Sequence, residues 1–335
     1  MNKNIFYKSI CGVIAVIILF GCSSLSAPDN VSSANTEIMQ FDNQIKNNSL
    51  AIDPSENLAV ALYSDDSVVR VYNLKSHSLI TTLNYVTPRN VEFAADGKSF
   101  YISDSSLGVI RQISVGDFST LREINIGKGA FGFAIDGKYM FVNNEAENTV
   151  SVINLSTWQV EHVIDGFANP RQGIKVGPSG KYVYVTNFKG DDVRIVNTET
   201  WRIERTLSGI PGVRAIAISP DETKLYGASS QSNSLRVVSI QSNQLIKTMP
   251  TEKDPYGASL SKDGKTLITG NKEDNSVQVF DASNYKLIKT IHGFIEPRQA
   301  IVYSKTQGQI YVLQKDLSIA VVNYKSNLNN LIIIK

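Results

Sequence analysis

The chain has 335 residues, of which 42% are hydrophobic and 19% charged, with 33 Lys and Arg against 31 Asp and Glu. This composition is typical of a folded globular protein and excludes collagen-like, disulfide-rich and intrinsically disordered chains. The near-neutral charge disfavours nucleic-acid binding, which needs a basic stripe. Any electrostatic function must therefore come from a local patch.

Residues 1–21 are typical of a secretory signal peptide. Lys3 and Lys8 precede an apolar run at 10–20, which is shorter than the roughly 20 residues that a bilayer span needs. The run ends in the letters LFGC at 19–22, which resemble the lipobox of bacterial lipoproteins. The resemblance implies cleavage before Cys22 and acylation of that cysteine. The alternatives are an ordinary signal cut elsewhere and an uncleaved anchor.

Residues 22–47 would then hold the acylated cysteine, a flexible tether rich in Ser and Asn, and a segment able to close a ring of strands. Cleavage would remove Cys11 and leave Cys22 as the only thiol, which suits an oxidising envelope compartment. It would also lower the basic count from 33 to 31, equal to the acidic count. Two or more acyl chains give firm membrane attachment, and Ser23 favours the outer membrane, facing the periplasm or the cell surface.

From Asn48 onward the sequence repeats at intervals of 40 to 44 residues. The seven equivalent turn positions are Asn57, Lys98, Lys138, Lys181, Lys224, Lys265 and Gln309. The fourth unit has short runs at 172–176, 182–187, 193–197 and 202–207 that are rich in Val, Ile and Tyr, as half-buried strands are. Gly or Asp in the turn between the first two runs is typical of a tight hairpin.

Seven such units predict an all-β fold: a seven-bladed β-propeller of four-stranded antiparallel blades over residues 48–335. Neither Trp158 nor Trp201 precedes an aspartate, which argues against WD40 repeats, and the period is short for kelch repeats. Two segments compete to close the ring: an apolar-alternating run at 36–45 and the C-terminal run at 331–334. Either would bring the two ends of the propeller together near one blade.

The letters YVTN at 184–187 have degenerate counterparts at 101–104, 141–144 and 311–314, and the phrase NTVSVIN at 148–154 recurs as NSVQVFD at 275–281. These motifs resemble the YVTN-repeat β-propeller family of bacterial surface and periplasmic proteins, over roughly the whole repeat region. The resemblance implies the fold but no single activity, because related proteins include adhesins, periplasmic binding proteins and subunits of redox enzymes.

Arginines recur in the segments that lead into the first strand of several blades, which we call lead-in loops. In a propeller these loops share one face with the loops between the second and third strands, and such loops carry binding sites on a rigid scaffold. Blades 4 and 7 repeat a longer phrase, GFANPRQ at 166–172 and GFIEPRQ at 293–299. The candidate ligand-binding residues are Arg89, Arg171, Arg214, Arg298, Tyr256 and Phe131.

These residues predict a channel mouth that binds an anion through bidentate guanidinium hydrogen bonds. The alternative is structural: each arginine would pair with an acidic residue of a neighbouring blade. The candidates are Asp65, Asp66, Glu145, Glu147, Asp191, Asp192, Glu273 and Asp274. The residues at the start of the fourth strands, His77, Trp158, Trp201 and Tyr285, share a repeat position that indicates packing at the opposite face.

A further alternative is a catalytic site at the channel mouth, for which seven-bladed lactonases offer the nearest precedent. Of the three histidines, His292 lies close in sequence to Glu296 and Arg298, and this trio is the best catalytic candidate. The sequence has no Gly-x-Ser-x-Gly elbow, no metal-ligand spacing of Cys and His, and no haem-attachment motif, so we expect neither a cofactor nor a metal.

The sequence thus favours a lipid-anchored binding or protein-interaction scaffold. Its ligand would be an anionic small molecule, a glycan or a partner protein, and its membrane contact would be through Cys22. A lactonase-like hydrolase using the same face is the first alternative. A DNA-binding periplasmic propeller is the second, which the balanced charge disfavours.

Overall fold

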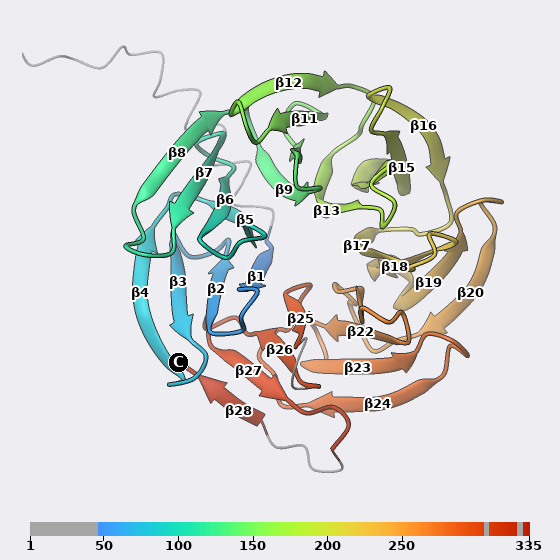
Figure 1. The fold of residues 1–335 in the computed structure, drawn as a ribbon. Coiled ribbons are helices and arrows are strands. Elements are labelled where there is room, and N and C mark those ends of the chain that lie inside the picture. Colours follow the sequence, from blue (N-terminus) through green and yellow to red (C-terminus); the bar gives the residue numbers. More distant parts are fainter. Residues whose placement is uncertain (1–45, 305–307, 327–330) are drawn as a thin grey trace, which may run out of the picture.

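The computed structural model describes residues 46–304, 308–326 and 331–335. Its strands form seven four-stranded antiparallel sheets, arranged as blades around a central axis (Figure 1). The prediction of an all-β, seven-bladed propeller is confirmed. The predicted signal peptide, Cys22 and the tether lie outside the described residues.

Each blade is made of four consecutive strands. Blade 1 contains β1 (Asn48–Ile52), β2 (Leu58–Tyr63), β3 (Val68–Asn73) and β4 (Ser78–Asn84), and blade 2 contains β5 (Pro88–Phe93), β6 (Ser99–Asp104), β7 (Val109–Ser114) and β8 (Thr120–Asn125). Blade 3 contains β9 (Ala130–Ile135), β10 (Tyr139–Asn144), β11 (Thr149–Asn154) and β12 (Gln159–Ile164), and blade 4 contains β13 (Pro170–Val176), β14 (Tyr182–Asn187), β15 (Asp192–Asn197) and β16 (Arg202–Leu207). Blade 5 contains β17 (Val213–Ile218), β18 (Lys224–Ser229), β19 (Ser234–Ser239) and β20 (Leu245–Pro250), and blade 6 contains β21 (Ser259–Leu260), β22 (Thr266–Asn271), β23 (Ser276–Asp281) and β24 (Leu287–His292). Blade 7 contains β25 (Ile301–Tyr303), β26 (Ile310–Leu313), β27 (Ile319–Val322) and β28 (Leu331–Ile334).

Burial differs sharply between the middle and the outer strands of a blade. Five of the six residues of β14 are buried, because both faces of this strand pack against other blades. The outer strand β16 instead alternates between exposed and half-buried positions, as a strand at the rim should. In blades 1 to 6 a register shift between the third and fourth strands marks a β-bulge, a feature that increases strand twist.

The core consists of seven apolar clusters, one at each interface between neighbouring blades. Three of the four residues predicted to pack at this position, Trp158, Trp201 and Tyr285, join these clusters. The prediction is wrong for His77, which is exposed. Trp158 stacks on Tyr101 of blade 2, with ring centroids 6.1 Å apart. Trp201 meets Tyr139 of blade 3 edge-on at 5.1 Å and stacks on His162 at 4.7 Å.

The ring closes between blades 7 and 1. One apolar cluster joins these two blades, and the Tyr72 hydroxyl donates a 2.6 Å hydrogen bond to the Leu317 carbonyl across the junction. The C-terminal candidate is confirmed as the outer strand of blade 7, because β28 pairs with β27. The competing segment at 36–45 lies outside the described residues.

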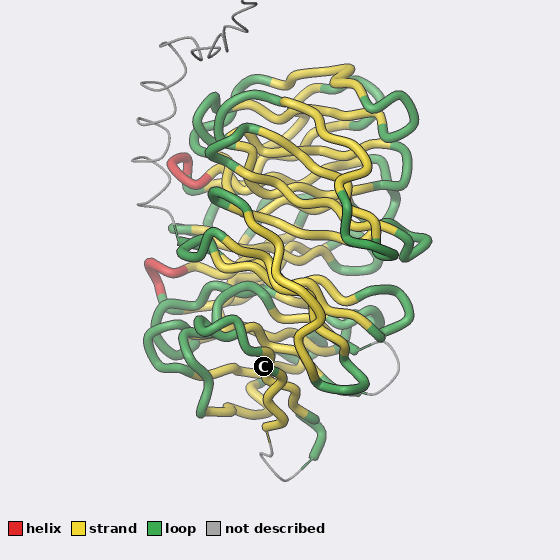
Figure 2. Tube along the Cα trace, turned by 90° about the vertical axis from the view of Figure 1, so that its left-hand side faces the viewer, coloured by secondary structure: helices red, strands yellow, loops and turns green. Residues whose placement is uncertain are grey.

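The two faces of the ring differ in their loops. The lead-in loops and the loops between second and third strands lie on one face, which we call the mouth face. Two short 3-10 turns, η1 (Phe188–Gly190) and η2 (Ser230–Ser232), lie together on it (Figure 2). The tight hairpins between first and second strands lie on the opposite face, which we call the turn face. In the part of the chain that the structure describes, no helix has the length and apolar character to cross a bilayer.

Candidate functional site

Each lead-in loop of blades 4 to 7 is held by the preceding blade. A residue just before the third strand of that blade has a positive φ and offers its side-chain oxygen to a backbone N–H of the next lead-in loop. The four pairs are Asn148 to Asn169 (2.7 Å), Asp191 to Gly212 (2.7 Å), Asn233 to Asp254 (3.0 Å) and Asn275 to Glu296 (2.8 Å). Asn and Asp tolerate this backbone conformation better than most residues, so the repeated motif fixes the loops.

The last residue of the second strand holds the lead-in loop of its own blade. The Asn187 side chain, which ends the YVTN letters, accepts a hydrogen bond from the Ala168 N–H and donates one to Asp192 at 3.0 Å. In blade 2 the Asp104 carboxylate accepts from the N–H groups of Val86 and Thr87. These bonds set where the arginines emerge at the mouth.

Three of the four predicted arginines are linked through two aromatic rings. Phe188 of η1 lies between Arg171 and Arg214, whose guanidinium carbons are 3.9 and 4.9 Å from the ring centroid. Tyr256 lies between Arg214 and Arg298, at 4.7 and 5.4 Å. All four distances are within cation–π range. The aromatic rings therefore hold guanidinium groups from blades 4, 5 and 7 around one mouth.

The fourth arginine is buried beside a predicted aromatic residue. Arg89 is fully buried, lies 4.6 Å from the Phe131 ring centroid, and donates hydrogen bonds to Ser105 (2.7 Å) and Asn47 (3.0 Å). The Asn47 side chain in turn donates to the Arg89 carbonyl at 2.6 Å. Arg89 is therefore part of the wall that supports the mouth.

Arg171 lies near one carboxylate and two other guanidinium groups. Its Nε lies 3.7 Å from the buried carboxylate of Glu145 in blade 3, so the structural alternative of pairing between blades holds for this arginine. Burial nevertheless lowers the pKa of Arg171, and repulsion from Arg214 and Arg89 lowers it further, while Glu145 opposes both. Arg214 hydrogen-bonds Ser230 at 3.1 Å and forms no ion pair within the described residues.

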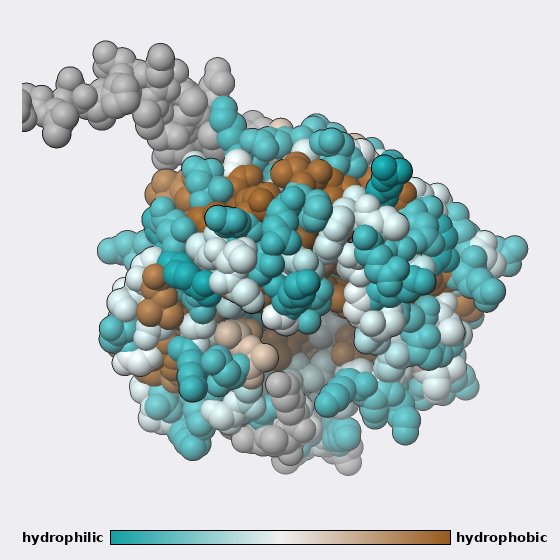
Figure 3. Space-filling view, turned by 45° about the horizontal axis from the view of Figure 1, so that its top comes forward, coloured by the Kyte–Doolittle hydropathy of each residue, from teal (hydrophilic) through white to brown (hydrophobic). Residues whose placement is uncertain are grey.

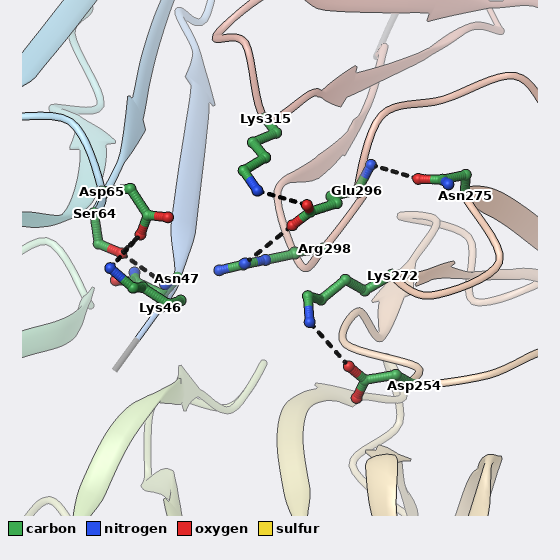
Figure 4. Close-up of polar contacts among 10 residues, drawn as sticks. All are labelled: Lys46, Asn47, Ser64, Asp65, Asp254, Lys272, Asn275, Glu296, Arg298 and Lys315. Atoms are coloured by element: carbon green, nitrogen blue, oxygen red, sulfur yellow. Dashed lines mark hydrogen bonds and ion pairs between the residues drawn. The ribbon is translucent and has the colours of Figure 1, made fainter. Parts of the chain in front are cut away.

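Arg298 is more deeply buried than Arg171. Its side chain is 3% exposed, against 21% for Arg171, and it lies 4.8 Å from the Tyr63 ring centroid. Its Nη2 pairs with Glu296 of the same loop at 3.4 Å, and Lys315 also donates to Glu296 at 2.6 Å. Figure 4 shows Arg298 extending from this loop towards the Lys46 side of the mouth.

A small cavity lies between these cations, with a volume of about 30 Å³. Its lining residues are Lys46, Asn47, Phe131, Arg171, Gln172, Phe188, Val213, Arg214, Tyr256 and Gln299. Lys46 pairs with Asp65 at 3.2 Å (Figure 4). The volume suits about one or two waters, or one carboxylate-sized group. Within the described residues, no cluster of three or more His, Cys, Asp and Glu is placed to hold a metal ion.

The structure brings together two members of the predicted catalytic trio and separates the third. Glu296 contacts Arg298, whereas the His292 side chain is 62% exposed and faces Glu252 at 3.7 Å. Partial burial would raise the pKa of Glu296, but the Lys315 hydrogen bond and the nearby Arg298 outweigh it and lower that pKa. Glu296 is therefore an ionised ion-pair partner at neutral pH.

Sequence reasoning missed six of the cavity residues: Lys46, Asn47, Gln172, Phe188, Val213 and Gln299. Phe188 follows the YVTN letters directly, and its place in a loop between second and third strands is the signal that could have found it. Lys46 precedes the first repeat, so the period of the sequence says nothing about it. Gln172 and Gln299 were within the repeated phrase but were not singled out.

A family model described as "Lactonase, 7-bladed beta-propeller" matches residues 196–303, about a third of the chain. The match includes blades 5 and 6 with Arg214, Tyr256 and Arg298. No curated protein matches the chain. Among solved structures, a chain of Kuenenia stuttgartiensis hydrazine synthase superposes with a TM-score of 0.72 at 13% identity, covering 86% of this chain and 94% of that one. At this identity the likeness shows the fold alone. The protein is thus a seven-bladed β-propeller, similar in part to lactonase-type propellers.

Proposed function

We propose that this protein is a binding propeller whose mouth holds an anionic group of a small molecule, a glycan or a partner protein. The observation that supports this most strongly is the small cavity lined by Lys46, Arg171 and Arg214. Of these three cations, Arg214 has no carboxylate partner in the described part of the chain. An anion bound there would relieve the repulsion among the guanidinium groups.

The surroundings suit a carboxylate or a similar group. Phe188 and Tyr256 restrain the guanidinium planes, so less side-chain entropy is lost when hydrogen bonds form. Hydrogen bonds to charged groups are worth about 1.5 to 3 kcal/mol each. The remainder of the ligand would lie outside the cavity, on the mouth face, because the enclosed volume fits only a head group.

A thermal-shift screen of the propeller tests this proposal. The panel pairs gluconate, glucuronate and phosphate with neutral glucose at equal ionic strength, and the variants are Arg171→Ala and Arg214→Ala. Arg202→Ala is the matched control, because Arg202 is exposed on an outer strand. We expect an anion to raise the melting temperature of the wild type and the control but not of the two mouth variants. Equal shifts in all four proteins would refute an anion site at the mouth.

A lactonase-like hydrolase on the same face is the second candidate, and the family model over residues 196–303 favours it. Hydrolysis of a lactone yields a hydroxy-carboxylate, a product that the cationic mouth would accommodate. In this candidate Glu296, beside Arg298, would take a proton from the water that attacks the lactone carbonyl. Release of acid from a panel of lactones should then disappear in Glu296→Gln but persist in His292→Ala, because His292 faces Glu252. No release by the wild type from any lactone would eliminate this candidate.

We also propose that the protein belongs to the YVTN-repeat propellers and is an envelope lipoprotein anchored through Cys22. This rests on the signal-like residues 1–21, the LFGC letters and the YVTN motifs alone. Metabolic labelling with a radioactive fatty acid should mark the wild type and not Cys22→Ser. The substitution should also move the protein from the membrane to the soluble fraction, and an unchanged membrane fraction would contradict the anchor.

A further inference from the structure

A layer of polar side chains crosses the channel just below the mouth. Asn47 donates to Gln172 at 2.9 Å, Gln172 donates to Asn90 at 2.7 Å, and Ser49 donates to Asn90 at 2.8 Å. These residues come from blades 1, 2 and 4, so the bonds span the axis instead of following one blade. The layer separates the cationic mouth from the rest of the channel.

A second and larger cavity lies on the other side of this layer. Its volume is about 660 Å³, and it extends from Asn48 and Gln299 at the polar layer to Pro54 and the exposed Ala95 at the turn face. Figure 3 shows that face hollowed near its centre. Cavities of roughly 300 to 1,000 Å³ are the size of small-molecule sites. The cavity is therefore large enough for a ligand and reaches the surface.

The cavity walls are mostly small and apolar, with two opposite charges. The apolar lining includes Ala51, Ala134, Ala215, Ile216, Ala258 and Ile301. Glu92 comes from blade 2 and Lys175 from blade 4, and blade 3 between them contributes only Phe133, Ala134 and Ile135. Within the described residues, neither charged side chain has a hydrogen bond or an ion pair, although Lys175 acts electrostatically on Glu92.

The carboxyl group of Glu92 is poorly compensated by the protein itself, whereas the exposed Lys175 is in contact with solvent. Burial raises the pKa of Glu92 to about 7, and the influence of Lys175 reverses only part of this effect. A carboxyl group in such surroundings gains from a cation placed beside it. At the polar layer, Asn48 is fully buried and its Nδ2 donates no hydrogen bond to the described residues. Buried donors are rarely left without an acceptor, so this end of the cavity suits a ligand oxygen.

We propose that this cavity binds a short apolar peptide as a zwitterion, with its ammonium group at Glu92 and its carboxylate at Lys175. A ligand with an ammonium group alone would compensate Glu92 but would make no use of Lys175. A neutral ligand would use neither charge. The apolar walls would hold the side chains of the peptide, and Asn48 would donate to its carbonyl oxygen. The site is separate from the anion site, so neither proposal depends on the other.

Calorimetric titration with the dipeptide Leu-Leu tests the proposal. Its N-acetyl form lacks the ammonium group, and its C-terminal amide lacks the carboxylate. We expect each blocked form to bind the wild type at least about 10-fold more weakly than Leu-Leu does, because one charge-assisted hydrogen bond is lost. Glu92→Gln should abolish the difference between Leu-Leu and the N-acetyl form. Lys175→Met should abolish the difference between Leu-Leu and the amide.

Glu199→Gln and Lys286→Met are the matched controls, because both residues are exposed and lie away from the cavity. They should bind all three peptides as the wild type does. Because Lys175 is itself exposed, its variant should fold even if the Glu92 variant does not. The proposal is overturned if Leu-Leu does not bind the wild type. It is also overturned if neither blocking group changes the affinity, or if the Lys175 substitution leaves the affinity unchanged.

Discussion

Blades 4 and 7 carry nearly the same lead-in phrase, yet their arginines reach different surroundings. In blade 4, Asn169 donates to Glu145 of blade 3 and accepts from Arg171 at 2.8 Å, so a neutral residue bridges the two charges. In blade 7 the equivalent residue is Glu296, which pairs directly with Arg298. Both loops have the same anchoring hydrogen bond from the preceding blade.

The residue before the proline therefore determines which carboxylate is the counter-ion of the arginine. A carboxylate in the loop itself pairs with one nitrogen of Arg298, whose buried Nε and Nη1 have no hydrogen-bond partner among the described residues. An amide in the same place leaves Arg171 to share a carboxylate across a blade interface and keeps it at the cavity. One repeated motif thus gives two arginines with different counter-ions, of which only Arg171 lines the cavity.

The largest expected effect is on stability. Glu296→Ala should lower the free energy of unfolding by about 2 to 3 kcal/mol, because removing one partner of a buried pair leaves a buried charge uncompensated. Asn169→Ala in blade 4 should lose a similar amount, about 1.5 to 3 kcal/mol, because Asn169 hydrogen-bonds the charged groups of Glu145 and Arg171 and Glu145 is buried. Urea unfolding of both variants measures these losses, and a loss below about 1 kcal/mol for either variant would contradict its role as a partner of buried charges.

Ligand affinity should differ between the two arginines. Arg171→Ala should weaken binding of the anion about 30-fold, roughly 2 kcal/mol for a charge-assisted contact. Arg298→Ala should weaken it less than about 3-fold in protein that remains folded, because Arg298 does not line the cavity. Calorimetric titration measures both constants. A larger loss for Arg298→Ala would mean that the ligand sits on the blade 7 side.

The repeat made the fold predictable because every blade buries the same strand positions, and these appear in the sequence as Val, Ile and Tyr at a fixed period. The arginines of the lead-in loops were also visible in the sequence, but Pro precedes the fully buried Arg89 as well as Arg171 and Arg298, and it does not precede Arg214. The sequence shows Asn169 before the proline in blade 4 and Glu296 before the proline in blade 7. The effect of this difference on charge pairing depends on contacts between blades, which the sequence does not show. Lys46 precedes the first repeat, and Phe188 occupies a repeated loop position whose counterparts Ser105, Glu145 and Lys315 are not aromatic, so no periodic pattern indicated either residue.

Acid should weaken the ion pair of blade 7. The pKa of Glu296 is lowered in the folded state, so its stabilising contribution is fully present above its unfolded value of 4.5 and is lost as the pH falls below that value. Replacement by Gln should therefore cost about 1 kcal/mol at pH 7 and less at pH 3.5. Unfolding curves at both pH values check this, and a constant cost of Glu296→Gln would be inconsistent with it.

The smallest expected effect concerns the anchor that both loops share. Asn148→Ala and Asn275→Ala each remove one hydrogen bond and leave a residue less suited to positive φ, at a cost of about 1 kcal/mol. We expect the two variants to lose similar stability in urea, because the geometry repeats. A difference of more than about 1 kcal/mol would show that the blades are not equivalent here.

The central proposal is that the cationic mouth, where Arg214 has no carboxylate partner among the described residues, binds an anion. The most direct test is calorimetric titration of the anion that gives the largest thermal shift into the wild type, the Arg171→Ala/Arg214→Ala double variant and the Arg202→Ala control. We expect saturable binding to the wild type and to the control. The affinity of the double variant should fall at least about 100-fold, because two charge-assisted contacts are removed. Unchanged affinity of the double variant would contradict an anion site at the mouth.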